Sequence, residues 1–302
     1  MNTVPRSGLT GFFGALAAAL QWRLLLWWML LLLIPTAVVA IPLWRHLAGM
    51  LDHAVGTAGW AQHIDALAVS DALENLICQG SAPGGAGLAG MLLALLLSPW
   101  LTGMVLASAR APRVGFIELA QVGLADYGRL LRLLIWSVLP LGIAVAAFAL
   151  LQHVAGGYAD KAVLEGAADR VSWACTLAAW LVYVVMHTMV ESARAAMLIE
   201  PGLRSATRAL GRGVMLVLRR PLASLLGYLA VTAIGAVLLL LVGALRLHTG
   251  GPGFVGMLAG FAVTQMLVLV LAWMRAARLF VLAGVMHHAP SRRRRAHRLA
   301  PV

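Results

Sequence analysis

Six apolar runs, each long enough to cross a lipid bilayer, constrain the fold of this chain more than any other feature. They lie at residues 24–43, 88–107, 133–151, 171–190, 222–245 and 254–274. About 20 residues of helix, rising 1.5 Å each, cross a hydrocarbon core of roughly 30 Å. Hydrophobic residues make up 62% of the chain and charged residues 11%, which excludes an ordinary soluble domain. The sequence therefore predicts an all-α, polytopic membrane protein with six transmembrane helices in one domain, 1–302.

The distribution of basic residues predicts the orientation of these spans. Six spans place both termini on one side, and 19 of the 23 Lys and Arg residues lie in segments on that side. Because cytoplasmic segments are enriched in Lys and Arg, both termini are predicted to be cytoplasmic. Segment 44–87 is then an external loop, and 289–302 is a basic cytoplasmic tail. A cleavable signal peptide is the alternative interpretation of 24–43, but the segment ahead of it is long for one.

The same charge pattern indicates the membrane and argues against nucleic acid as a partner. The formal net charge of +12 comes from arginines that flank apolar runs, as the positive-inside rule requires. Lys161 is the only lysine, which we interpret as codon bias of a GC-rich genome. We therefore expect a multi-pass protein of a bacterial inner membrane.

Three related strings end the inward-going spans and indicate an internal repeat. They are ASARAPR at 107–113, ESARAAM at 191–197 and AWMRAAR at 272–278. Each outward-going span is preceded by a candidate amphipathic helix, at 8–22, 114–132 and 203–220. We predict three two-span units, each with a cytoplasmic surface helix, in which Arg110, Arg194 and Arg275 are equivalent. The shared composition of Ala-rich helices is the alternative explanation.

Residues 191–220 form a strongly basic segment between two spans, with six Arg against two Glu. Arg204, Arg208 and Arg212 follow one another at i+4 steps, so they share one stripe if the segment is helical. The C-terminal tail adds Arg292, Arg293, Arg294 and Arg295. Arginines near an anionic leaflet attract its headgroups, so we expect both segments to bind anionic lipid. The alternative is that these arginines only fix the topology.

The run from Met197 to Leu216, MLIEPGLRSATRALGRGVML, carries a resemblance to a known group. It resembles the cytoplasmic segment of bacterial multi-span proteins that include the membrane domain attached to some glycerophosphoryl diester phosphodiesterases. The matching positions are Ile199-Glu200, Ser205, Ala209-Leu210 and Arg212. The resemblance implies an inner-membrane module and not an enzyme, because the spans leave no room for a soluble catalytic barrel.

Three polar residues in or beside the predicted spans are candidates for chemistry. His187 and Glu191 are four residues apart on the fourth span and can face one metal or proton, but two ligands do not make a metal site. The simpler interpretation is that His187 faces neighbouring helices and that Glu191 pairs with Arg194 or another interfacial arginine. Gln265 is expected to form an interhelical hydrogen bond, with a transport path as the alternative. We predict no catalytic residue, cofactor or metal.

These patterns favour a non-enzymatic module that organises anionic lipid, or a membrane protein partner, through cytoplasmic Arg-rich helices. A transporter or permease for an apolar or amphiphilic solute is the alternative, and an intramembrane enzyme is third. Few ionisable groups lie at the centres of the spans, which argues against an ion-coupled pump.

Overall fold

The computed structural model describes residues 9–51, 81–111, 114–162, 164–249 and 253–287. Within these ranges the regular elements are ten helices: α1 (Leu9–Ala18), α2 (Trp22–Leu51), α5 (Ser81–Arg110), α6 (Phe116–Ala125), α7 (Tyr127–Trp136), α8 (Val138–Ala159), α9 (Glu165–Ile199), α10 (Ala206–Arg219), α11 (Pro221–His248) and α12 (Phe254–His287). Six helical segments are long and apolar enough to cross a membrane, with α7 and α8 counted as one. The prediction of a multi-pass, all-α membrane protein is confirmed.

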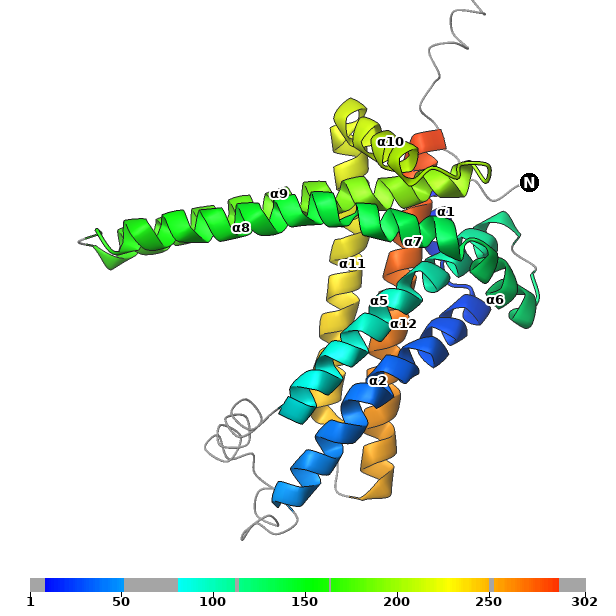
Figure 1. The fold of residues 1–302 in the computed structure, drawn as a ribbon, viewed down its shortest axis with the longest axis horizontal. Helices are drawn as coiled ribbons and strands as arrows, with labels where there is room; N and C mark the ends of the chain where they lie inside the picture. The colour runs from blue at the N-terminus through cyan, green and yellow to red at the C-terminus, as the bar shows by residue number, and fades with distance from the viewer. Residues whose placement is uncertain (1–8, 52–80, 112–113, 163, 250–252, 288–302) are drawn as a thin grey trace, which may run out of the picture.

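The long helices form three hairpins that share one base. α2 packs on α5, α8 on α9 and α11 on α12. The short helices α1, α6, α7 and α10 lie where the hairpins converge, and the α8–α9 hairpin extends away from the other two (Figure 1). We call this convergence the hub. It consists of the four short helices and of the adjoining segments of the long helices, Trp22–Leu31, Leu101–Arg110, Thr188–Ile199 and Ala272–Met286.

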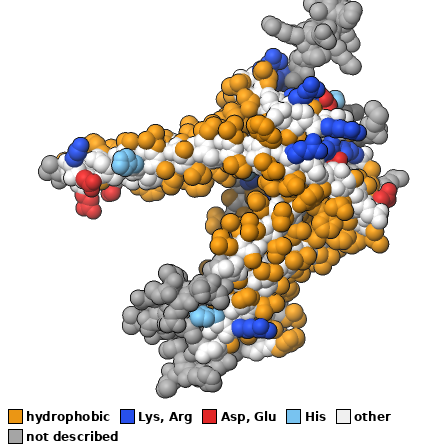
Figure 2. Space-filling view, viewed as in Figure 1, with side chains coloured by type: hydrophobic (Ala, Val, Ile, Leu, Met, Phe, Trp, Pro, Cys, Tyr) orange, Lys and Arg blue, Asp and Glu red, His pale blue; other side chains and the backbone are white. Residues whose placement is uncertain are grey.

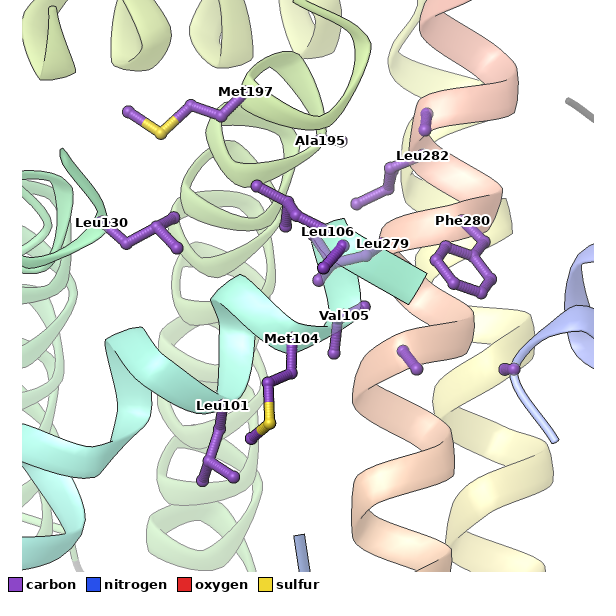
Figure 3. Close-up of a cluster of buried hydrophobic side chains, with 14 of the residues drawn as sticks. Leu101, Met104, Val105, Leu106, Leu130, Ala195, Met197, Leu279, Phe280 and Leu282 are labelled. Carbon is purple, nitrogen blue, oxygen red and sulfur yellow. The ribbon is translucent and has the colours of Figure 1, made fainter. Parts of the chain in front are cut away.

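The hydrophobic core lies in the hub. Its largest fully buried apolar side chains come mainly from α5, α9 and α12 and include Leu101, Met104, Leu106, Met197, Leu279 and Leu282 (Figure 3). Beyond the hub the hairpins expose apolar side chains such as Val145, Leu181 and Leu240 (Figure 2). Helices that are hydrophobic on all sides occur in buried cores or in membranes. The hub is therefore the part held together by protein contacts, and the rest of each hairpin is suited to lipid.

Tryptophan side chains connect the short helices to the long ones. The indole Nε1 of Trp27 donates to the carbonyl of Phe116 at 2.8 Å, which joins α2 to the start of α6. On the last hairpin, Trp273 donates to the carbonyl of Leu16 at 3.1 Å and so fixes α1 against α12. A buried indole N–H is costly unless it finds an acceptor, so these bonds fix where the short helices lie.

Several helices extend beyond the predicted spans. The helices run past the apolar runs, so that α9 ends at Ile199 and α12 at His287. The ends of the predicted external loop, 44–87, are helical, because α2 reaches Leu51 and α5 begins at Ser81. Residues 52–80 and the predicted tail, 289–302, lie outside the described residues.

The segment 114–132 was predicted to be one amphipathic helix and is not. α6 ends at Ala125 and α7 begins at Tyr127. A second break at Ser137 separates α7 from α8. Pro140 explains this break, because its nitrogen cannot donate to the carbonyl four residues earlier, at the end of α7. The order of elements still repeats three times as short helix and then hairpin, but the three-dimensional equivalence of the units stays a prediction.

Candidate functional site

The helix α10 begins where Ser205 caps it. The Ser205 hydroxyl accepts a hydrogen bond from the backbone N–H of Arg208, the capping geometry that Ser favours. One face of α10 is buried, and α10 packs on α9. The residues of this face recur at helical spacing and are Ala206, Ala209, Gly213, Leu216 and Val217. Arg208 and Arg212 are exposed on the same helix. Arg204 is also exposed but precedes the cap, so the prediction of three arginines on one helix is wrong at that residue.

A pocket of about 660 Å³ opens between α10 and the ends of α9 and α12. Its polar lining consists of Glu200, Arg212, Arg219, Arg220 and His287. Its apolar lining consists of Ala196, Ile199, Met215, Leu216 and Met286. We call this cavity the arginine pocket. It combines a cationic rim with an apolar wall, and it is built by the consecutive helices α9 and α10 together with α12, which is distant from them in sequence.

The arginine pocket carries more positive charge than its single carboxylate can balance. Glu200 forms an ion pair with Arg212, and both side chains are about half exposed to solvent. Exposed ion pairs contribute little, so Arg212 can change partner at small cost. Arg219 and Arg220 form no ion pair with a carboxylate among the described residues. With His287 neutral, the pocket therefore has a formal charge of +2 to offer an anion.

A second set of polar side chains, some buried and some partly buried, lies in and beside the hub, and we call it the charged cluster. It consists of Trp28, Ser98, His187, Glu191, Arg194, Tyr228, Arg275 and Arg278. Glu191 is 1% exposed, and its Oε1 accepts a hydrogen bond from Arg194 at 2.6 Å. The structure thus shows the Glu191–Arg194 pair expected from the sequence. All three hairpins contribute to the cluster.

His187 connects two hairpins. Its Nδ1 lies 3.0 Å from the Tyr228 hydroxyl on α11, and its Nε2 lies 4.0 Å from Glu191 Oε1. His187 therefore faces a neighbouring helix, as the simpler interpretation expected. Within the described residues, no three His, Cys, Asp or Glu side chains converge as metal ligands.

Two arginines of α12 complete the charged cluster. Arg275 donates to the Ser98 hydroxyl at 2.9 Å, and its guanidinium carbon lies 5.5 Å from the centre of the Trp28 ring. The guanidinium of Arg278 lies 4.8 Å from the centre of the Tyr228 ring. Cation–π contacts of this kind stabilise a guanidinium but bring no negative charge. The sequence marked Arg275 only as a member of the repeat and did not single out Arg278.

The remaining described carboxylates near the hub have other partners. Asp126 pairs with Arg110 at 2.9 Å and with Arg129 at 2.7 Å. Glu118 accepts a hydrogen bond from the backbone N–H of Gly115 at 3.3 Å. Glu200 belongs to the arginine pocket. Glu191 is therefore the carboxylate that the charged cluster contains.

The other residues predicted from the sequence do not join these sites. The buried Oε1 of Gln265 has no hydrogen-bond partner among the described residues, so the expected interhelical bond to this atom is absent. Gln265 lies on α12 ten residues before Arg275, which places it nearly three helical turns from the charged cluster. Arg292, Arg293, Arg294 and Arg295 lie outside the described residues.

No family model, curated protein or solved structure matches this chain. The resemblance to the membrane domain of phosphodiesterases stays a prediction. What the structure shows is an integral membrane protein with six apolar helical segments in the part of the chain that it describes.

Proposed function

We propose that this protein is a non-enzymatic module of a bacterial inner membrane that binds and organises anionic lipid through the arginine pocket. The observation that carries the proposal is the combination of Arg212, Arg219 and Arg220 with an apolar wall in one cavity. A guanidinium matches the oxygens of a phosphate group, and acyl chains need apolar surface. An anionic phospholipid presents both chemistries in one molecule.

The placement of charge supports this proposal. Lys and Arg side chains gather at the hub end of the molecule (Figure 2), and α10 adds the exposed Arg208 beside the pocket. Among the described residues, the other basic side chains lie toward the far ends of the hairpins, at Arg45, Lys161, Arg170 and Arg246. If the hub faces the cytoplasm, as the positive-inside rule favours, the arginine pocket lies at the leaflet whose surface potential attracts it.

Changing two pocket arginines tests the proposal. We expect Arg212→Gln with Arg219→Gln to lose most of the phosphatidylglycerol that co-purifies in mild detergent, as measured by native mass spectrometry. Each arginine near an anionic surface contributes about 1 kcal/mol, so the pair corresponds to roughly 30-fold in affinity. Retained phosphatidylethanolamine is expected to change little, because that lipid has no net charge.

The matched control removes the same charge at the far ends of the hairpins. Arg45→Gln with Arg246→Gln lowers the net charge equally and leaves the arginine pocket intact. We expect this variant to keep its phosphatidylglycerol. Equal lipid content in the pocket variant, the control and the wild type would refute the proposal and leave the pocket arginines with a role in topology only.

A further inference from the structure

The charged cluster has an imbalance of charge. Arg194, Arg275 and Arg278 bring three positive charges. Glu191 interacts electrostatically with all three and is the one carboxylate that the described residues place in the cluster. With His187 neutral, the formal sum is +2 inside the hub. Buried charge without a counter-charge is costly, and removing one partner from a buried pair costs several kcal/mol.

The charged cluster also has more hydrogen-bond donors than it uses. The Nε–H groups of Arg275 and Arg278 are inaccessible to solvent and have no acceptor among the described residues. The indole Nε1 of Trp28, a residue only 4% exposed, is likewise unpartnered. The two arginines are three residues apart and therefore share one face of α12, and the Trp28 ring lies against the Arg275 guanidinium. Trp28 of α2 thus lies beside Arg275 of α12, and each carries an unpartnered donor next to excess positive charge.

The acceptors already present do not resolve this imbalance. Glu191 Oε1 is occupied by Arg194, and Oε2 has no partner and does not reach either Nε–H. The carboxylates of Asp126 and Glu200 are paired elsewhere. Water can accept a hydrogen bond, but it brings no negative charge. An oxyanion supplies both the acceptors and the charge.

We propose that the charged cluster is a binding site for one phosphate group, bound by Arg275 and Arg278 with Trp28 Nε1 as a further donor. Guanidinium–phosphate contacts are charge-assisted and stronger than neutral hydrogen bonds, and a phosphate dianion matches the formal charge of +2. The group comes either from inorganic phosphate or from a lipid headgroup. The site shares no residue with the arginine pocket and does not depend on the proposed function.

Phosphate titration of the purified full-length protein tests this site. The delipidated protein is titrated with sodium phosphate, with sodium chloride at the same ionic strength as reference, and thermal unfolding is followed together with calorimetric binding. We expect a saturable rise of the melting temperature with phosphate only. Arg278→Gln should weaken phosphate binding by about 10- to 100-fold, which corresponds to one hydrogen bond to a charged group.

Two further variants keep the result interpretable. Trp28→Phe retains the ring packing and removes only the Nε1 donor, so it should fold and bind phosphate more weakly than the wild type. The titrations are repeated in an Arg212→Gln, Arg219→Gln background, which removes phosphate bound at the arginine pocket. In that background Arg278→Gln should still weaken the remaining phosphate binding by about 10- to 100-fold.

A lipid arm identifies the source of the phosphate group. If the ligand is a headgroup, nanodiscs of phosphatidylglycerol without free phosphate should stabilise the wild type more than Arg278→Gln, relative to nanodiscs of phosphatidylcholine. If the ligand is inorganic phosphate, the stabilisation should appear only on titration. The proposal is overturned if phosphate acts no differently from chloride and both lipids stabilise the two proteins equally, or if Trp28→Phe and Arg278→Gln bind phosphate as the wild type does.

Discussion

The packing of α10 on α9 positions the arginine pocket, and Gly213 is the point of closest approach that tests it. A Cβ built at Gly213 would lie 2.7 Å from the backbone nitrogen of Ala193 and 3.1 Å from its Cα, and it would overlap the carbonyl oxygen of Met189. These are backbone atoms of α9, so no side-chain rotation relieves the overlap. Gly213→Ala therefore forces α10 away from α9, although the new methyl group is small.

Gly211 is a matched control on the same helix. A Cβ at Gly211 meets no atom within 4 Å, so Gly211→Ala brings the helix propensity of Ala without an overlap. Replacing Gly by Ala inside a helix gains about 0.5–1 kcal/mol, and both variants share that gain. Their difference therefore isolates the overlap, which overpacking data place at about 1–3 kcal/mol.

The assay is the free energy of unfolding of both variants and the wild type in mixed micelles, followed by circular dichroism. We expect Gly211→Ala to be slightly more stable than the wild type. Gly213→Ala should be less stable than Gly211→Ala by the cost of the overlap, about 1–3 kcal/mol. Gly213→Ala should also lose phosphatidylglycerol, because α10 supplies one wall of the arginine pocket. Equal stability of the two variants would show that α10 does not pack on α9 through Gly213.

Two further predictions address the charged cluster and the topology. Glu191→Gln removes the carboxylate that Arg194 contacts and should destabilise the protein by about 3–5 kcal/mol in thermal unfolding. Changing Arg194→Gln as well should recover part of that loss, because no unpaired guanidinium is left. Equal instability of the single and the double variant would contradict the pairing. The topology is tested by cysteine labelling in a background in which Cys78 and Cys175 are changed to Ser. Lys161→Cys and His248→Cys should react with a membrane-impermeant maleimide added outside the cell, and Gly202→Cys should not. Labelling of Gly202→Cys alone would show that the predicted orientation is reversed.

The sequence predicted the number and positions of the long helices because the bilayer imposes a simple rule. A span needs about 20 apolar residues, and the runs from Leu24 to Met274 satisfy that requirement six times. The helices extend beyond the predicted spans because hydropathy marks the hydrocarbon core and not the end of the helix. Residues 191–199 of α9 and 275–287 of α12 continue as helix, since their buried faces pack in the hub. Where a helix continues from the membrane into the packed hub, hydropathy does not indicate the residue at which it ends.

The sites were predictable only where they depend on local spacing. The i+4 step from Arg208 to Arg212 and the three-residue step from Glu191 to Arg194 are readable from the sequence, and the structure shows both on helices. The arginine pocket needs the ends of α9 and α12 beside α10, and the charged cluster needs Trp28 beside Arg275. Such contacts join residues far apart in the chain and depend on how the hairpins pack.

The hub decides how the three hairpins share one bilayer. Figure 1 shows that the α8–α9 hairpin runs crosswise to α11 and α12. Helices that all cross one bilayer are instead tilted only moderately from a common axis. Few protein contacts restrain the outer part of that hairpin, and its exposed apolar surface gains most from lipid on all sides. Its direction is therefore set at its base, where α9 packs on α12 and Arg194 lies within electrostatic range of Arg275. Glu191 offsets part of the repulsion among these guanidiniums, and an anion bound by Arg275 and Arg278 would offset more of it. A phosphate group in the charged cluster would thus shift the orientation of the α8–α9 hairpin toward the one that binds phosphate more tightly. The size of that shift equals the difference in phosphate affinity between the orientations.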